Sequence, residues 1–234
     1  MNIAIIGYGQ MGKEIEKISI SRDHVIGKII DLNTQNKDLS DCDVAILFTT
    51  PDSAIQNIKL CLDYKIPVVC GTTGWLEKYD YITDYCKRKD ATFLFSPNFS
   101  IGVNLFFKLN SFFAEKMSKS KKFNVSVHEK HHLKKIDNPS GTAIKIAEDI
   151  LSNYSFSGWS LKDEKNMLKI YSDRVGNEKG FHEVLYESEH DSISISHNAK
   201  SRKGFALGAV LCAEWIFDKK GVFTMDDFLN NINF

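Results

Sequence analysis

A glycine-rich loop near the start of the chain constrains the fold more than any other segment. The loop, Gly7 to Gly12, has the pattern G-x-G-x-x-G, follows a short apolar segment and precedes one with helical periodicity. In dinucleotide-binding folds the first glycine allows a tight turn, the second lets the backbone approach a pyrophosphate, and the third lets helix and strand pack closely. The residues expected to contact a dinucleotide are therefore Gly7, Tyr8, Gly9, Gln10, Met11 and Gly12.

A second apolar segment, Val25 to Ile30, leads to an acidic residue. Asp31 stands 24 positions after Gly7, and a carboxylate at the end of the second strand accepts hydrogen bonds from the adenosine ribose hydroxyls. The alternative is a glycine-rich turn in an α/β protein that binds no nucleotide. Because the strand, the helix and Asp31 all agree with the motif, we favour a dinucleotide site.

Strand-like and helix-like segments keep alternating as far as residue 95. They are, in order, Val44 to Phe48, Ala54 to Asp63, Pro67 to Cys70, Tyr79 to Arg88 and Thr92 to Phe95. Strands separated by helices pair in parallel through right-handed crossovers, so we expect a Rossmann-type α/β domain. Ligands bind at the carboxyl edge of such a sheet. Gly71, Thr72 and Thr73 follow one of these strands and are expected to line the nicotinamide side of the site.

The pattern changes in the second half of the chain. Its strand-like segments are Phe123 to Glu129, Leu168 to Ser172, Glu183 to Ser188 and Ser192 to Ser196. Its helix-like segments are Leu105 to Met117, the stretch after Thr142, Phe205 to Phe217 and Asp226 to Ile232. Strands without alternating helices favour a mostly antiparallel sheet, so residues 103–202 are expected to form an inserted α+β domain. Residues 1–102 and 203–234 would together form the dinucleotide-binding domain.

The composition argues against several classes of protein. The 30 lysine and arginine residues balance 30 aspartate and glutamate residues, so the net charge does not favour a nucleic-acid partner. Five cysteines occur singly, which fits free thiols in a reducing compartment better than disulfides or a zinc site. The sequence has neither a signal-peptide pattern nor an apolar stretch long enough to cross a bilayer. We expect a soluble, cytoplasmic protein with no membrane partner.

Residues 129–142 carry the densest group of chemically active side chains. Two histidines, His131 and His132, precede Lys135, and a Pro-Ser-Gly-Thr turn opens a segment of helical periodicity. Proton donors therefore lie beside a helix N-terminus, whose unpaired N–H groups attract anions. This arrangement suits an enzyme that acts on a carboxylate or phosphate substrate. The alternative is a basic, solvated surface loop.

Together these motifs resemble the dihydrodipicolinate reductase family of bacterial and plant lysine biosynthesis, over nearly the whole chain. The resemblance rests on the glycine loop, Gly71-Thr72-Thr73-Gly74, the run Asn98 to Asn104, the H-H-x-x-K-x-D-x-P-S-G-T pattern of residues 131–142, Arg174-x-Gly176-x-x-x-Gly180-x-His182, and Ser201-Arg202. The family fold has a dinucleotide-binding domain completed by the C-terminal segment. Its inserted α+β domain binds substrate and forms a homotetramer.

The resemblance implies NAD(P)H-dependent reduction of a cyclic imino dicarboxylate, (hydroxy-tetra)dihydrodipicolinate, to tetrahydrodipicolinate. His131 would be the catalytic histidine and Lys135 the proton donor. The substrate would contact His132 and the backbone of Gly141 and Thr142. The implied cofactor contacts are the glycine loop, Asp31, Gly71, Thr72, Thr73, Ser96, Pro97, Asn98 and Phe99. Arg202 is a further candidate contact of cofactor or substrate, and no metal is implied.

Two departures from the family pattern concern the cofactor. Family members commonly have a longer glycine loop with an arginine before Met-Gly, where this chain has Gln10, and many have an arginine where Leu32 follows Asp31. Both differences remove positive charge that would neutralise the 2′-phosphate of NADPH, and Asp31 would repel that phosphate. We therefore expect NADH to be preferred and NADPH to be possible, with Lys13 or Lys37 as the residues able to compensate.

Three other interpretations remain. A different two-domain NAD(P)-dependent dehydrogenase acting on an amino or imino acid would share the glycine loop without needing the 131–142 pattern. A non-catalytic dinucleotide sensor would need neither His131 nor Lys135. Metal binding by His131 and His132 is disfavoured, because adjacent residues point in different directions on regular structure and no close Cys or carboxylate completes a zinc set.

Overall fold

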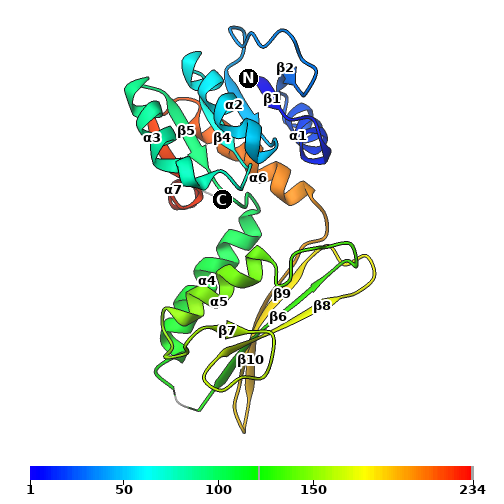
Figure 1. Ribbon diagram of the computed structural model, residues 1–234, viewed down its shortest axis with the longest axis vertical. Helices are drawn as coiled ribbons and strands as arrows, with labels where there is room; N and C mark the ends of the chain where they lie inside the picture. Colours follow the sequence, from blue (N-terminus) through cyan, green and yellow to red (C-terminus); the bar gives the residue numbers. More distant parts are fainter. Residues whose placement is uncertain (121, 233–234) are drawn as a thin grey trace. The chain divides into compact units, whose positions relative to one another are not determined.

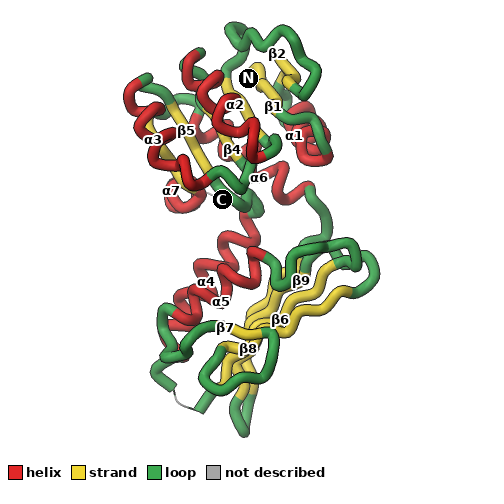
Figure 2. Tube along the Cα trace, in the orientation of Figure 1, coloured by secondary structure: helices red, strands yellow, loops and turns green. Residues whose placement is uncertain are grey.

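The computed structural model of the protein describes residues 1–120 and 122–232 and divides into two compact units (Figures 1 and 2). The first unit comprises Met1–Ile101 and the C-terminal residues from Arg202, and the second comprises Gly102–Ser201. Each observed boundary lies one residue before the one expected from the sequence. None of the helices in the described ranges is long and apolar enough to cross a membrane.

A six-stranded sheet, in which every neighbouring pair is parallel, forms the first unit. Its strands are β1 (Asn2–Ile6), β2 (Val25–Ile30), β3 (Val44–Leu47), β4 (Val68–Cys70), β5 (Thr92–Phe95) and β11 (Gly221–Thr224). The order is β11-β5-β4-β3-β1-β2. The connections therefore change direction at β1, where a crevice opens at the carboxyl ends of the strands. The parallel sheet confirms the expected Rossmann-type architecture.

Helices cover both faces of this sheet. On one face α2 (Pro51–Asp63) and α3 (Tyr79–Arg88) bury their apolar sides, and a short 3₁₀ turn, η1 (Leu76–Lys78), precedes α3. On the other face lie α1 (Gln10–Ser21), α6 (Lys203–Ile216) and α7 (Met225–Asn231). Strands β1 and β3 are buried on both faces of the sheet, which explains why their sequences are almost continuously apolar.

The second unit contains a five-stranded sheet of order β10-β9-β6-β8-β7. Its elements are α4 (Ile101–Met117), β6 (Asn124–His131), α5 (Gly141–Leu151), β7 (Trp159–Ser160), β8 (Leu168–Arg174), β9 (Phe181–Glu187) and β10 (Ser192–Asn198). The sheet is mixed, so the expected antiparallel pairing holds for two of the four neighbouring strand pairs. Strand β9 pairs antiparallel with β6 and β10, but β8 pairs parallel with β6 and β7. The reason is that α5 lies in a crossover from β6 to β8, which a parallel pair requires.

Helices α4 and α5 pack on one face of this second sheet (Figure 2). The inward positions of β6 follow a period of two, beginning with the buried apolar residues Val125 and Val127. The next two inward positions are Glu129 and His131, which are also buried. The core-facing side of the sheet therefore turns polar at the carboxyl end of β6, where α5 begins.

Candidate active site

The carboxyl ends of β1 and β3 border a first hollow of about 310 Å³ in the first unit. Gly7, Tyr8, Gly9 and Asp31 all line it. Gly7 has a φ of +92°, and a Cβ there would lie 2.1 Å from the Phe48 carbonyl oxygen, so the turn requires glycine. Gly9 differs, because among the described residues no atom outside its chain neighbours lies within 4 Å of the position its Cβ would take. The space beside Gly9 is therefore open, as the approach of a pyrophosphate to the glycine loop requires.

A second hollow, of about 380 Å³, shares Gly9, Phe48 and Thr49 with the first. Its lining also contains the expected contacts Gln10, Met11, Gly71, Thr72, Thr73 and Arg202. The loop after β4 is held in place by hydrogen bonds. Thr49 N–H donates to the Thr72 hydroxyl at 2.8 Å, and the Trp75 indole donates to the Thr72 carbonyl at 2.6 Å. These two hollows together contain most of the residues expected to bind a nucleotide.

Five expected cofactor contacts line neither hollow. Gly12 packs α1 against the glycine loop, where a Cβ would lie 2.3 Å from the Gly7 carbonyl oxygen. The other four follow β5: Ser96, Pro97, Asn98 and Phe99. The Ser96 hydroxyl donates to the Asn98 carbonyl at 2.7 Å. The Phe99 ring is buried in the core against Phe48, with ring centroids 5.9 Å apart, so any contact of Phe99 with a nucleotide would involve its backbone.

The first hollow also contains the residues on which cofactor choice depends. Asp31 and Leu32 line it side by side and are both exposed, and Lys37 is the only cation among the described residues that line it. Lys13 has its Nζ 5.9 Å from the centre of the Tyr8 ring. The hollow therefore has one carboxylate and one ammonium group close to the expected ribose position.

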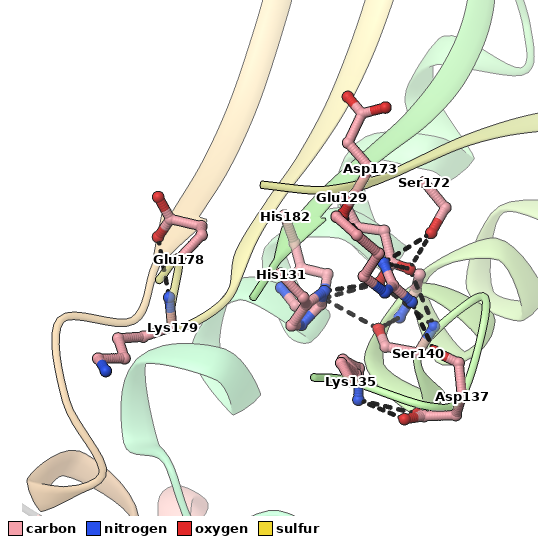
Figure 3. Close-up of polar contacts among 12 residues, drawn as sticks. Glu129, His131, Lys135, Asp137, Ser140, Ser172, Asp173, Glu178, Lys179 and His182 are labelled. Atoms are coloured by element: carbon pink, nitrogen blue, oxygen red, sulfur yellow. Dashed lines mark hydrogen bonds and ion pairs between the residues drawn. The ribbon is translucent and has the colours of Figure 1, made fainter. Parts of the chain in front are cut away.

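In the second unit, three neighbouring strands bring polar side chains together at one end of the sheet (Figure 3). Glu129 on β6 is in register with Ser172 on β8 and with His182 on β9, and His131 is in register with Arg174 on β8. Glu129 is 1% exposed, His131 7% and His182 5%. A group of ionisable side chains is thus buried together at one end of the sheet.

The Glu129 carboxylate is at the centre of this group. Its Oε1 accepts a hydrogen bond from the Ser172 hydroxyl and lies 3.3 Å from Arg174 Nη1, and its Oε2 lies 3.5 Å from His182 Nε2. The Ser140 N–H donates to both oxygens, at 3.1 and 3.3 Å. Burial raises the pKa of a carboxyl group, but hydrogen bonds from His182, Ser140 and Ser172 outweigh it and hold the pKa of Glu129 far below its ordinary value. Glu129 is therefore an anion at neutral pH.

His131 is held as a neutral imidazole. Its Nδ1 lies 3.3 Å from Glu129 Oε2 without the geometry of a hydrogen bond, and its ring centre is 5.0 Å from that of His182. Burial disfavours the imidazolium more than Glu129 favours it, and the pKa of His131 falls from 6.5 to about 4. Electrostatic interactions with the neighbouring His182, Lys135 and Arg174 lower it further. At neutral pH His131 is therefore a hydrogen-bonding group without charge.

Acidification should destabilise the protein through His131. An unfolded histidine takes up a proton near pH 6.5 and the folded one only near pH 4, so the unfolded state binds more protons between these values. The free energy of unfolding should therefore fall as the pH is lowered through this window, by about 3 kcal/mol from this group. Urea unfolding at a series of pH values measures the slope, and His131→Gln should make it shallower.

Two other histidines, His128 and His197, are present in both the wild type and His131→Gln. Burial also lowers the pKa values of His128 and His197, so both contribute to the slope in the wild type and in the variant and cancel in the difference. Identical slopes for the two proteins would mean that His131 titrates in the folded protein as it does in an unfolded chain.

The loop after β6 carries the expected proton donor, Lys135. Its Nζ donates to both carboxylate oxygens of Asp137, at 2.7 and 2.8 Å (Figure 3). Partial burial raises the pKa of Asp137, but the hydrogen bond and charge of Lys135 outweigh it and lower that pKa. Arg174 Nη2 donates to the Asp137 carbonyl and so ties the loop to β8. His132 is half-buried, and its carbonyl accepts the Lys135 N–H at 3.1 Å.

Helix α5 begins directly after this loop with Ser140 as its N-cap. The Ser140 hydroxyl accepts the Ala143 N–H at 3.1 Å, and the Ser140 carbonyl accepts the Ile144 N–H at 3.0 Å. Within residues 1–120 and 122–232, no group accepts a hydrogen bond from the N–H of Gly141 or Thr142. A helix start with two unpaired N–H groups is suited to bind an anion such as a carboxylate.

Sequence reasoning assigned no role to Glu129, Ser140, Ser172, Arg174 or His182, although the motifs behind the family resemblance include Ser140, Arg174 and His182. The strand patterns contained a further signal. On β6 the inward series Val125, Val127 continues with Glu129, so a charged residue occupies a position patterned for the core. The inward positions of β8 likewise run from apolar residues to Ser172 and Arg174. Polar residues at buried strand positions, repeated on neighbouring strands, are the pattern that would have indicated this group.

One statement about metal binding needs correction. The sequence suggested that no carboxylate lies close to His131, but Glu129 is in contact with it, and ligand atoms of Glu129, His131 and His182 lie within 4.8 Å of one another. The surroundings nevertheless do not favour a cation. The Glu129 carboxylate already accepts hydrogen bonds from two serines, and the Arg174 guanidinium lies 3.3 Å from it.

Comparison with known proteins accounts for both units. Residues 1–99 match dihydrodipicolinate reductase, N-terminus, and residues 102–229 match dihydrodipicolinate reductase, C-terminus. A protein from Christiangramia forsetii named 4-hydroxy-tetrahydrodipicolinate reductase is 48% identical over 236 residues, which cover 99% of either chain. A protein of the same name from Archaeoglobus fulgidus is 31% identical over 261 residues, covering 98% of this chain and 100% of the other.

A solved structure shares the fold. Dipicolinate-bound dihydrodipicolinate reductase from Paenisporosarcina sp. TG-14 aligns with a TM-score of 0.77 at 22% identity, over 97% of this chain and 99% of that one. The first unit is accordingly a dinucleotide-binding domain, as the glycine loop predicted. With both halves of the chain matched and full-length relatives at 48% and 31% identity, the protein belongs to the dihydrodipicolinate reductase family.

Proposed function

We propose that this protein is an NAD(P)H-dependent 4-hydroxy-tetrahydrodipicolinate reductase of the diaminopimelate and lysine pathway. It reduces a cyclic imino dicarboxylate to tetrahydrodipicolinate. The observation that carries the proposal furthest is the start of α5, where two unpaired N–H groups follow a loop that bears Lys135. The glycine-loop hollows of the first unit supply the complementary requirement, a place for the nucleotide.

The substrate's carboxylates determine how it binds. One carboxylate accepts hydrogen bonds from the N–H groups of Gly141 and Thr142, at the positive end of the α5 dipole. His132 contacts the substrate from the neighbouring loop. The solved relative from Paenisporosarcina sp. TG-14 binds dipicolinate, a planar ring with two carboxylates, and the same chemistry suits this helix start.

Proton delivery falls to Lys135. Reduced nicotinamide, held beside the glycine loop of the first unit, would supply the hydride, and the ring system of the substrate would then carry excess negative charge on the adjacent carbon and nitrogen. The Lys135 ammonium group stabilises this charge and donates the proton that completes the reduction. His131, neutral at pH 7, orients the substrate through a hydrogen bond without adding a charge.

Isotope transfer tests this reaction directly. Reduced nicotinamide carrying deuterium at the transferable position should yield tetrahydrodipicolinate that contains one deuterium atom by mass spectrometry. The substrate is produced in the same tube by a synthase from pyruvate and aspartate semialdehyde. Product without deuterium, formed in the presence of the protein, would exclude hydride transfer from the nucleotide.

We also propose that NADH is preferred over NADPH, so that kcat/KM is higher for NADH. Support comes from Asp31 and Leu32, which line the first hollow side by side; of the lining residues that the structure describes, Lys37 alone is a cation. Leu32→Arg would place a guanidinium beside the expected 2′-phosphate. We expect it to raise the ratio of kcat/KM for NADPH to that for NADH by about tenfold, the size of one partly screened charge interaction.

Leu32→Gln is the matched control, because glutamine extends the side chain without a charge and should leave the ratio unchanged. Lys37→Ala should lower kcat/KM for NADPH more than for NADH if Lys37 compensates for Asp31. A wild-type protein that clearly favours NADPH would refute the charge argument.

A homotetramer in the cytoplasm completes the proposal. It rests on the family resemblance and on the second sheet, which carries both helices of the second unit on one face and, within the described residues of that unit, no helix on the other (Figure 2). Light scattering coupled to size-exclusion chromatography should give four times the chain mass of 26.6 kDa. A monomeric mass would contradict it.

A further inference from the structure

We propose that Glu129, paired with Arg174, is the positioning residue that holds two parts of the substrate site in register, the anion-binding start of α5 and the His131 ring. The inference rests on the proposed roles of His131, Gly141 and Thr142. It adds a residue that is buried beneath them and acts through them (Figure 3).

One carboxylate contacts both parts of the site. The Glu129 oxygens accept the Ser140 N–H at 3.1 and 3.3 Å, and Ser140 immediately precedes Gly141. The Oε2 atom of the same carboxylate lies 3.3 Å from His131 Nδ1. A shift of Glu129 would therefore move the helix start and the imidazole together, whereas no other described side chain contacts both Ser140 N–H and His131.

His182 connects the same carboxylate to the helix cap. Its Nε2 lies 3.5 Å from Glu129 Oε2 and 3.1 Å from the Ser140 hydroxyl, which itself accepts the Ala143 N–H. The N-cap of α5 is therefore bonded to strand β9 as well as to β6. This arrangement fixes the direction in which the N–H groups of Gly141 and Thr142 point.

Arg174 makes a buried carboxylate compatible with an anionic substrate. Its Nη1 lies 3.3 Å from Glu129 Oε1, so the pair carries no net charge and does not repel a dicarboxylate nearby. Arg174 also donates to the Asp137 carbonyl in the loop that carries Lys135. The ion pair thus connects the proton donor's loop to the same buried centre.

The test separates positioning from general stability. Glu129→Gln keeps the shape and one acceptor for the Ser140 N–H but removes the charge that faces His131 and Arg174. We expect kcat to fall by about tenfold to a hundredfold, as for small displacements of catalytic groups. KM for the dicarboxylate should rise, whereas the Kd of NADH, bound by the first unit, should stay unchanged.

Glu187→Gln serves as the matched control, because Glu187 lies exposed at the end of β9 in the same sheet. It removes the same charge and should leave kcat and KM as in the wild type. If Glu129→Gln fails to fold, two variants of His182 test the same connection. His182→Gln places an amide N–H near the position of Nε2 and should retain more activity than His182→Ala.

Pyridine-2,6-dicarboxylate gives a readout that needs no turnover. Its Kd, measured by calorimetry, should increase in Glu129→Gln and in His182→Ala but not in Glu187→Gln. If the wild type is active and Glu129→Gln leaves kcat, KM and the dicarboxylate Kd unchanged, the inference about Glu129 is overturned, whereas the proposed function is not affected. The inference is also overturned if His182→Gln and His182→Ala retain the same activity. A wild type that turns over no substrate refutes the proposed function instead, and the binding comparison then still decides whether Glu129 positions the site.

Discussion

Lys135→Ala is expected to lower kcat by about two to four orders of magnitude, the contribution of a positioned general acid. The affinity for NADH should not change, because Lys135 lies in the second unit and the glycine-loop hollows lie in the first. The loss should appear in kcat and kcat/KM together, since the ammonium group is needed most when negative charge develops on the ring. Steady-state kinetics with NADH binding measured separately checks both expectations.

The neighbouring residue supplies a control for charge. Lys134 is exposed in the same loop, and Lys134→Ala removes one positive charge at almost the same place without removing the proton donor. Its kcat should stay within a few-fold of the wild type. A Lys135→Ala protein with wild-type kcat would eliminate Lys135 as the acid, and equal losses in the two variants would reduce its role to local charge.

Gly9→Val is expected to weaken NADH binding by about a hundredfold and to leave the melting temperature almost unchanged. No atom of a described residue beyond its chain neighbours lies within 4 Å of the position of a Cβ on Gly9, and its φ of −75° and ψ of −157° are those of extended backbone, which valine can adopt. The branched side chain would instead occupy the space needed by the pyrophosphate. Loss of two charge-assisted hydrogen bonds accounts for about this change in affinity.

Gly7→Val provides the contrast. A Cβ at Gly7 would lie 2.1 Å from the Phe48 carbonyl oxygen, and the φ of +92° is unfavourable for valine. This variant should lose thermal stability and nucleotide binding together. Calorimetric melting and NADH titration of both variants separate the two effects. A Gly9→Val protein that binds NADH as the wild type does would show that the pyrophosphate does not pass the glycine loop here.

The first unit follows closely from local sequence signals. The strand before Gly7, the helix after it and the alternation up to residue 95 each depend on patterns within about a dozen residues. Strand β11 was not predicted, because a strand of four residues has little local signal. It is stabilised by pairing with β5, which lies far away in the sequence. The parallel pairing of β8 with β6 was missed for the same reason, since local periodicity does not reveal which strands become neighbours.

The candidate site was predictable in part. His131, Lys135 and the Pro-Ser-Gly-Thr turn lie within one segment, so their types and spacing could be recognised together. Glu129 looked like one more charged residue until the alternation of β6 placed it inside the sheet. Its partners Arg174 and His182 come from strands more than 40 positions later, and only the tertiary fold brings them to the same carboxylate.

Turnover by the wild-type protein tests the proposed reductase activity most directly. A synthase supplies the cyclic imino dicarboxylate from pyruvate and aspartate semialdehyde, and the oxidation of NADH or NADPH is followed by absorbance. We expect oxidation only when the synthase, both of its substrates and this protein are all present. It should be faster with NADH and inhibited by pyridine-2,6-dicarboxylate. No oxidation of either nucleotide under these conditions would contradict the assignment.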